Sequence, residues 1–191
     1  MPKERKDWFD FARTPVGADY TVSVQVELWD IEHTHVCFVL DQGGTKTRRG
    51  ITHEKPRGWG NPGGAVSEGE TPLEGAIREV EQETNHMRKT FRINPIPVEV
   101  IPIHGAKAKE GKERYKVVFV GRIIDPHELL MSGPVKDPAG GSAGGVISRL
   151  WIAFHDLPGM EEVMSPGFLL HGEPIYRSHL GNIYSHQGEE I

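Results

Sequence analysis

One stretch, from Trp59 to His86, constrains this chain more than any other. It reads WGNPGGAVSEGETPLEGAIREVEQETNH, which is a glycine turn, a polar connection and then a segment with helical spacing. Thr71 is a favourable N-cap, Pro72 suits the first helical position, and Glu74 completes a capping box. Asn85 tolerates the left-handed conformation that often ends a helix. The stretch therefore predicts a helix from Thr71 to about Asn85.

The predicted helix has two different faces. Its expected core positions follow helical spacing and are Leu73, Ile77, Val80 and Thr84. Glu79, Gln82 and Glu83 stand at i, i+3 and i+4, so their oxygens gather on another face. Oxygen donors grouped in this way suit a hard divalent cation. The alternative is an ordinary solvated acidic face, but the glycine turn, Glu70 and Arg78 at set distances argue against it.

The same stretch resembles the Nudix box. That pattern is G, five residues, E, seven residues, R-E, an apolar residue, a free position, E-E, a free position, G and an apolar residue. Six positions match in register, namely Gly64, Glu70, Arg78, Glu79, the apolar Val80 and Glu83. The preceding W-x-x-P-G-G is also common in that family. Three positions depart from the pattern: Gln82 replaces a Glu, Asn85 replaces the Gly, and His86 replaces an apolar residue.

The resemblance implies a fold and a reaction. The fold is α/β in the broad sense (α+β), with a mixed β-sheet flanked by helices as in the Nudix α/β/α sandwich. The reaction is hydrolysis of a nucleoside diphosphate linked to another group, with Mg²⁺ or Mn²⁺ as the cofactor. Carboxylates that hold such cations neutralise phosphate oxygens and acidify bound water. Two alternatives stay open: a nucleotide-binding module that has lost the chemistry, and an interaction protein.

Roles for individual residues follow from the same resemblance. Glu79 and Glu83 would be metal ligands, and one of them would help to deprotonate water. Arg78 would pair with a glutamate of the box and hold its orientation. Glu70 would be a supporting carboxylate near the metal.

Weaker oxygen donors would complete the coordination. The resemblance implies a backbone carbonyl at Gly63 or Gly64. Gln82 offers an oxygen without charge, which predicts weaker metal binding or one fewer ion. A further carboxylate from outside the box would have to come from one of a few acidic residues, which are Asp137, Glu110, Glu113 and Glu128.

Substrate contacts are less sharply predicted. Residues 41–57 are polar and basic, which indicates either a solvated loop or a source of cations for substrate phosphates, with Arg57 as the first candidate. Trp59 could stack on a base or form part of the core. Asp137 lies in a Gly-rich loop before the last strand of the domain. The expected partner is a nucleotide-type diphosphate, but the box does not identify which one.

Three segments are expected along the chain. Residues 1–19 form an N-terminal extension that packs on the domain, contacts a second copy in a homodimer, or covers a pocket. Residues 20–160 form the Nudix domain. Residues 161–191 form a C-terminal helical tail packed on that domain, with a helix after Pro174.

Strands are expected where apolar residues alternate or run together. From Tyr20 to Leu28, valines alternate with Ser23, Gln25 and Glu27, which predicts a half-buried strand. The other elements expected are strands at residues 35–40, 115–124 and 148–154, an extended segment at 89–104, and a helical turn at 126–131.

Composition excludes several classes of protein. The chain has 191 residues, enough for one domain with a core. Its net charge of −5 argues against a general binder of nucleic-acid polymers. No apolar run approaches the length of a membrane span, and the first residues lack the apolar segment of a secretory signal. Cys37 lies in an apolar run, which predicts a buried thiol. A cytoplasmic protein is the resulting expectation.

Overall fold

The computed structural model describes residues 7–48, 51–55, 57–103, 113–128, 130–135, 145–153, 156, 169–170 and 173–174. Its elements, in chain order, are α1 (Trp8–Arg13), β1 (Tyr20–Trp29), β2 (His35–Asp41), β3 (Gly44–Arg48), β4 (Ile51–Lys55), β5 (Gly58–Gly60), α2 (Pro72–Thr84), β6 (Phe91–Ile93), β7 (Glu99–Pro102), β8 (Glu113–Ile123), β9 (Gly133–Pro134), β10 (Val146–Ala153), β11 (Leu169–Leu170) and β12 (Glu173–Pro174).

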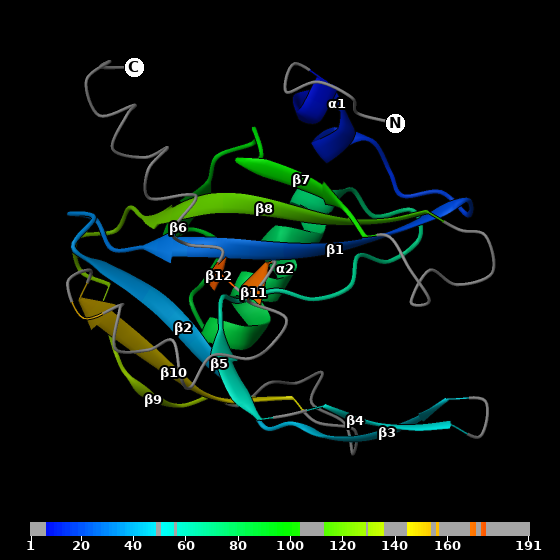
Figure 1. Ribbon diagram of the computed structural model, residues 1–191. Coiled ribbons are helices and arrows are strands. Elements are labelled where there is room, and N and C mark those ends of the chain that lie inside the picture. The colour runs from blue at the N-terminus through cyan, green and yellow to red at the C-terminus, as the bar shows by residue number, and fades with distance from the viewer. Residues whose placement is uncertain are drawn as a thin grey trace.

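A mixed β-sheet forms the centre of the molecule. Its strand order is β6-β8-β1-β2-β10-β9, with β5 added beside β2 and β7 beside β8. The long strands β1 and β8 run parallel, whereas the other pairs in this sheet are antiparallel. Helix α2 packs against one face of the sheet (Figure 1). The mixed sheet with a few helices confirms the expected α+β class.

The core lies between α2 and the sheet. Val24, Val26 and Leu28 of β1 are almost fully buried there, together with Val80 of α2 and Phe119 of β8. The period-2 pattern of β1 directs these side chains to a single face, because successive residues of a strand point to opposite sides. The strand prediction for this segment is therefore confirmed.

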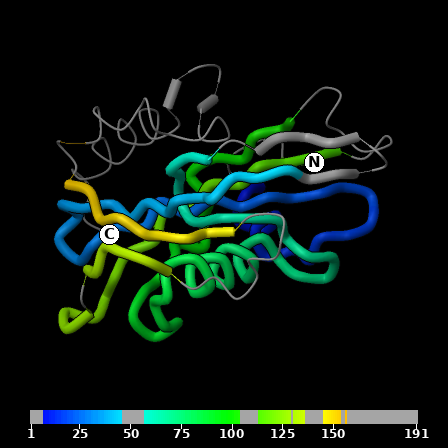
Figure 2. The backbone as a smooth tube through the Cα atoms, turned by 90° about the horizontal axis from the view of Figure 1, so that it is seen from below, coloured from blue at the N-terminus to red at the C-terminus, as the bar shows by residue number. Residues whose placement is uncertain are grey.

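Strands β1 and β2 are paired over only a short length. They pair at Leu28↔Cys37 and Trp29↔Val36 and then diverge, as Figure 1 shows. Figure 2 gives the same backbone seen from below. The glycine turn occupies the resulting gap, since the amide of Val24 donates to the carbonyl of Gly64 at 2.9 Å and the amide of Val26 donates to that of Pro62 at 2.8 Å. The sheet thus holds the turn by backbone hydrogen bonds.

The N-terminal segment packs on the domain. Ala12 of α1 is fully buried, and the ring of Phe11 lies 5.5 Å from that of Tyr115 and 5.9 Å from that of Tyr20. Beyond the helix, the amide of Val16 donates to the carbonyl of Glu70 at 2.9 Å. Of the three roles expected for residues 1–19, packing on the domain is the one that these contacts support.

Some local predictions were wrong. Residues 41–57 are not only a loop, because β3 and β4 pair as an antiparallel hairpin and β5 follows them. At Pro126 to Met131 the described residues contain no helix. A turn stands there instead, in which a carboxylate oxygen of Asp125 accepts from the amide of His127 at 2.9 Å. The helix expected after Pro174 lies outside the described residues. No helix in the described part of the chain is long and apolar enough to cross a membrane.

Glu27 is a further correction, because the alternating pattern placed it on a solvated side. Its side chain is 1% exposed and accepts a hydrogen bond from Nε1 of Trp29 at 2.9 Å. Burial raises the pKa of Glu27 to about 8. The carboxyl group is therefore protonated in the folded protein and ionised in the unfolded chain between its ordinary pKa of 4.5 and about 8. Within this window, stability falls as pH rises.

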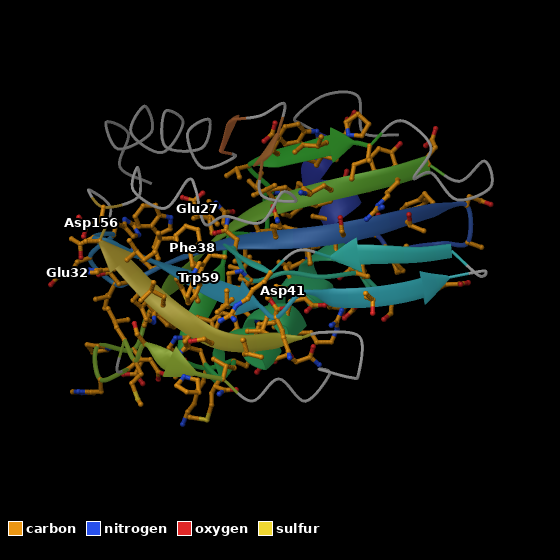
Figure 3. All side chains as sticks on the ribbon, turned by 60° about the horizontal axis from the view of Figure 1, so that its bottom comes forward. Glu27, Glu32, Phe38, Asp41, Trp59 and Asp156 are labelled. Carbon is orange, nitrogen blue, oxygen red and sulfur yellow. The ribbon has the colours of Figure 1, made fainter. Side chains whose placement is uncertain are left out.

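We predict that Glu27→Gln removes this pH dependence. Glutamine keeps an oxygen for Trp29 and has no proton to release, so the gain in Tm over wild type should grow from pH 5 to pH 8 and reach about 5 °C. Thermal unfolding at several pH values measures it. Glu32→Gln, at an exposed position in the turn between β1 and β2 (Figure 3), should give a profile parallel to wild type. A Glu27→Gln profile parallel to wild type would contradict the prediction.

Candidate active site

Helix α2 begins and ends as its sequence predicts. The hydroxyl of Thr71 accepts from the amide of Glu74 at 3.1 Å, and the Glu74 carboxylate accepts from the amide of Thr71 at 2.9 Å. Asn85 closes the helix in the left-handed conformation, with φ of 58°. The predicted capping box and C-cap are both confirmed.

The predicted core face of α2 is confirmed. Val80 and Thr84 are fully buried, and Leu73 and Ile77 are partly buried and pack against the same core. Gly75, Ala76 and Glu79 are buried as well, which the spacing did not predict. The helix is thus turned so that Glu79, which is 8% exposed, lies against the glycine turn.

Arg78 connects most of the acidic groups of the box. Its guanidinium donates to both carboxylate oxygens of Glu70, from Nε at 2.8 Å and from Nη2 at 3.0 Å. Its Nη1 donates to Oε1 of Glu79 at 2.6 Å and to Oε1 of Gln82 at 3.2 Å, and Nη2 also reaches the carbonyl of Ala65 at 3.0 Å. These bonds hold the pKa of Glu70 below its usual range, mainly because the charged carboxylate accepts from Arg78. Arg78 therefore holds the segment from Ala65 to Glu70, which follows the glycine turn, against helix α2.

The two glycines of the turn bring the acidic side chains close to the backbone. The amide of Gly63 donates to Oε2 of Glu83 at 2.7 Å. At Gly64, an added Cβ would lie 2.5 Å from Oε1 of Glu79, so only glycine leaves room for that carboxylate. Glu79 and Glu83 thus flank one short piece of backbone.

The donor set fits a hard divalent cation. Glu79, Glu83 and Gln82 supply side-chain oxygens from one face of α2, and oxygen is the ligand type that Mg²⁺ and Mn²⁺ take. The space that Gly64 leaves beside Glu79 supports this fit, because a side chain there would fill it. The described residues contain no group of three or more His, Cys, Asp or Glu side chains that could hold a metal ion.

A cavity of about 210 Å³ opens beside the turn, in the gap between β1 and β2. Its walls include Gly63, Gly64 and Glu83. The other lining residues come from strands β1, β2, β5, β8 and β10 and from the residue that follows β5. Those used below are Gln25, Val39, Asp41, Asn61, Lys116 and Val146. The site therefore combines the acidic end of α2 with a recess in the sheet.

Most predicted substrate contacts lie elsewhere. Arg57 is exposed and does not line the cavity. Trp59 pairs with Leu40 of β2, is partly buried, and lies with Phe38 on the sheet face away from α2 (Figure 3). Asp137 lies outside the described residues.

The other acidic candidates are also distant from the cavity or not described. Glu113 accepts from the hydroxyl of Tyr115 at 2.7 Å, and Glu128 contacts Nδ1 of His86 at 2.7 Å. Neither lines the cavity, and Glu110 lies outside the described residues.

Sequence reasoning missed several cavity residues. Lys116 is a cation inside an apolar strand, and Asn61 is a polar residue between Gly60 and Pro62; both are unusual enough in context to have drawn attention. Asp41 ends β2 and had no sequence signal beyond its position. These side chains meet only because β1 and β2 diverge.

His86 takes the place of an apolar residue at the end of the box. It is 1% exposed, its ring lies 5.7 Å from that of Trp151, and burial lowers its pKa. Neutral imidazole can pack in a core as an apolar ring does, so this departure from the pattern preserves the packing. Asn85 likewise preserves the helix end, which leaves Gln82 as the departure that removes a charge from the acidic face of α2.

Comparison with known proteins identifies the family of this chain. The family model described as NUDIX domain matches residues 33–168. A curated relative, the nucleoside triphosphate pyrophosphatase/Nudix hydrolase fusion protein of Bifidobacterium longum (strain NCC 2705), is 36% identical over 72 residues. That match covers 36% of this chain and 13% of the relative, so the chain spans only a small part of it.

Solved structures resemble the fold at low sequence identity. The Nudix hydrolase from Nitrosomonas europaea has a TM-score of 0.48 and 18% identity, and the alignment covers 85% of this chain and 90% of that one. The MutT protein from Methanosarcina mazei Go1 also has a TM-score of 0.48 and 18% identity, covering 92% and 99%. The family match, which spans most of the chain and includes the whole box, shows that this protein belongs to the Nudix family.

Proposed function

We propose that this protein is a divalent-metal-dependent hydrolase that cleaves the diphosphate of a nucleoside diphosphate linked to another group. The observation that supports it most is the placement of Glu79 and Glu83 against the Gly63–Gly64 turn, at the edge of a cavity. Membership of the Nudix family supports hydrolysis of pyrophosphate bonds in general. The metal and the kind of substrate belong to the proposal.

Each residue of the box has a separate task in this proposal. Glu79 and Glu83 hold the cation, assisted by the oxygen of Gln82 and a carbonyl of the turn. When bound, the cation supplies charge neutralisation for phosphate oxygens and a water molecule of lowered pKa. Arg78 holds Glu79 in place, and Glu70 holds Arg78. Lys116, half-buried in the cavity wall, supplies a cation for the substrate anion.

Hydrolysis of a panel of nucleoside diphosphate derivatives with Mg²⁺ or Mn²⁺ tests the proposal. Wild-type protein should release product from at least one member, and the double variant Glu79→Gln/Glu83→Gln should not. Both substitutions keep side-chain volume and an oxygen acceptor, so the fold should survive in the variant. Equal turnover by the two proteins would rule out the proposed metal site.

A binding module without turnover is the second candidate. It is favoured by one observation, that Nη1 of Arg78 contacts both Glu79 and the uncharged Gln82, in a box that lacks its third carboxylate. In that case, no member of the panel would be hydrolysed, and one member would raise the Tm of the wild-type protein.

Restoring the missing carboxylate should strengthen the metal site. We predict that Gln82→Glu tightens Mg²⁺ binding by about tenfold, because a charged oxygen replaces a neutral one beside Glu79. Calorimetric titration of Mg²⁺ measures it. Asn94→Asp adds the same charge at an exposed position that does not line the cavity, and it should leave the titration unchanged. An unchanged titration in Gln82→Glu would mean that this side chain does not face the ion.

We propose Asp41 as the carboxylate from outside the box. It lines the same cavity as Glu83, and its Oδ1 accepts from the amide of Gly43 at 2.8 Å, a bond that asparagine can keep. Asp41→Asn should therefore lower kcat by roughly 100-fold with little change in Tm. Asp125→Asn is a matched control, because Asp125 also accepts from a backbone amide but lies outside this cavity. Equal losses in the two variants would contradict the assignment.

A further inference from the structure

The cavity wall contains a buried side-chain amide, that of Asn61. Asn61 is 6% exposed, and within the described part of the chain neither Nδ2 nor Oδ1 has a hydrogen-bond partner. Most buried polar groups are paired, and an unpaired one costs about 1–3 kcal/mol. A side chain with both polar atoms in this state needs an explanation, and a ligand in the adjoining cavity provides one.

Gln25 of strand β1 contributes a second buried polar atom to the cavity wall. Its Oε1 is buried and likewise lacks a partner among the described residues, and it too lines the cavity. The two side chains come from different elements, since Gln25 lies on β1 and Asn61 follows β5. The wall therefore offers at least two acceptors and one donor to whatever enters.

Apolar side chains complete the recess. Val39 and Val146 are 4% and 5% exposed and belong to one small cluster, and both line the cavity. Mostly apolar walls with a few placed polar groups are typical of small-molecule sites. At about 210 Å³ the cavity is below the usual range for a whole ligand of that kind, so it would hold only one part of a nucleoside diphosphate derivative.

We infer that Asn61 and Gln25 recognise the hydrogen-bonding edge of the substrate's nucleobase. A carboxamide presents a donor and an acceptor side by side, and this pattern pairs with a base edge that carries an acceptor and a donor, as in asparagine–adenine pairs. A flat heterocycle also suits the valine walls. The inference rests on the proposed function for the identity of the substrate, and it assigns the base to this cavity.

The position of the cavity agrees with this assignment. Glu83 and both turn glycines line its other end, so a base in the recess would direct the attached phosphates towards the acidic face of α2. Asn61 is joined to Gly63 through Pro62 alone, and the carbonyl of Pro62 accepts from the amide of Val26 at 2.8 Å. Base recognition and the metal face are thus held on one rigid turn.

Binding of nucleoside 5′-monophosphates without metal tests the inference. We expect at least one of the adenosine, guanosine, cytidine and uridine monophosphates to bind wild-type protein about tenfold or more tighter than ribose 5-phosphate, as measured by calorimetry. Asn61→Leu should reduce the affinity for that nucleotide to the affinity for ribose 5-phosphate. Gln25→Leu should cause a smaller loss.

Control variants and analogues separate recognition from damage to the fold. Gln42→Leu removes an exposed amide that does not line the cavity and should leave base preference unchanged. Asn61→Asp keeps the shape of the side chain, and it should weaken or change the base preference because it replaces the donor by an acceptor. If the Asn61 variants do not fold, an analogue that lacks the exocyclic group of the preferred base should bind wild-type protein about as weakly as ribose 5-phosphate.

Two results would overturn the inference. One is equal binding of ribose 5-phosphate and all the nucleotides by the wild-type protein. The other is a base preference that survives in Asn61→Leu, especially if that variant is more stable, since Asn61 would then hold only water. Failure of the proposed hydrolase is a separate outcome, because this assay needs no metal and no turnover.

Discussion

Replacing Glu83 by glutamine should lower kcat/KM by roughly 100-fold or more while leaving Tm close to that of the wild-type protein. The substitution removes one of the two charged oxygens that the box still offers to a cation. It also preserves the local fold, because a glutamine oxygen can accept from the amide of Gly63 as the carboxylate does at 2.7 Å. Steady-state kinetics with Mg²⁺, beside thermal unfolding, measures both effects.

Glu81→Gln provides the matched control on the same helix. The Glu81 carboxylate also accepts from a backbone amide, that of Arg88 at 2.9 Å, but it does not line the cavity. Its variant should be as active as the wild type. If Glu83→Gln turned over substrate as fast as the wild type, Glu83 would not be a metal ligand. A drop in Tm that parallels the loss of activity would instead indicate a structural role for Glu83.

Replacing Gly63 by alanine should affect stability more than replacing Gly64 by alanine. At Gly63, an added Cβ would lie 2.2 Å from the carbonyl oxygen of Val24 and 2.9 Å from Cα of Gln25. Both are backbone atoms of β1, so the turn itself must move away from the strand. We predict that Gly63→Ala lowers the free energy of unfolding by about 3 kcal/mol, at the upper end of overpacking effects.

At Gly64, the added Cβ would meet only the carboxylate of Glu79, the end of a side chain that can move. Gly64→Ala should therefore cost about 1 kcal/mol of stability and lose most of the activity, because Glu79 is displaced. Gly17→Ala is the control for both variants, since nothing lies within 4 Å of the added atom. Denaturant unfolding and kinetics on the three variants measure the contrast. Similar stability of Gly63→Ala and Gly64→Ala would contradict it.

The sequence alone determined α2 and the chemistry of its acidic face. Capping by Thr71 and Asn85 acts within a few residues, so the ends of the helix can be read from the local sequence. The i, i+3, i+4 spacing of Glu79, Gln82 and Glu83 is fixed by helix geometry in the same way. The alternation in β1 is also local, and it predicted a strand with its valines in the core.

Tertiary structure decided which groups meet this helix, and it buried Glu79 beside the predicted core face. Glu27 and Gln25 alternate with the same valines. Glu27 is nevertheless buried, and Oε1 of Gln25 is buried without a hydrogen-bond partner among the described residues, and both outcomes depend on segments distant in sequence. The cavity exists because β1 and β2 pair at only two positions before they diverge. That divergence brings Asn61 to the recess and leaves Arg57 outside it, a long-range consequence of strand register that spacing along the chain cannot reveal.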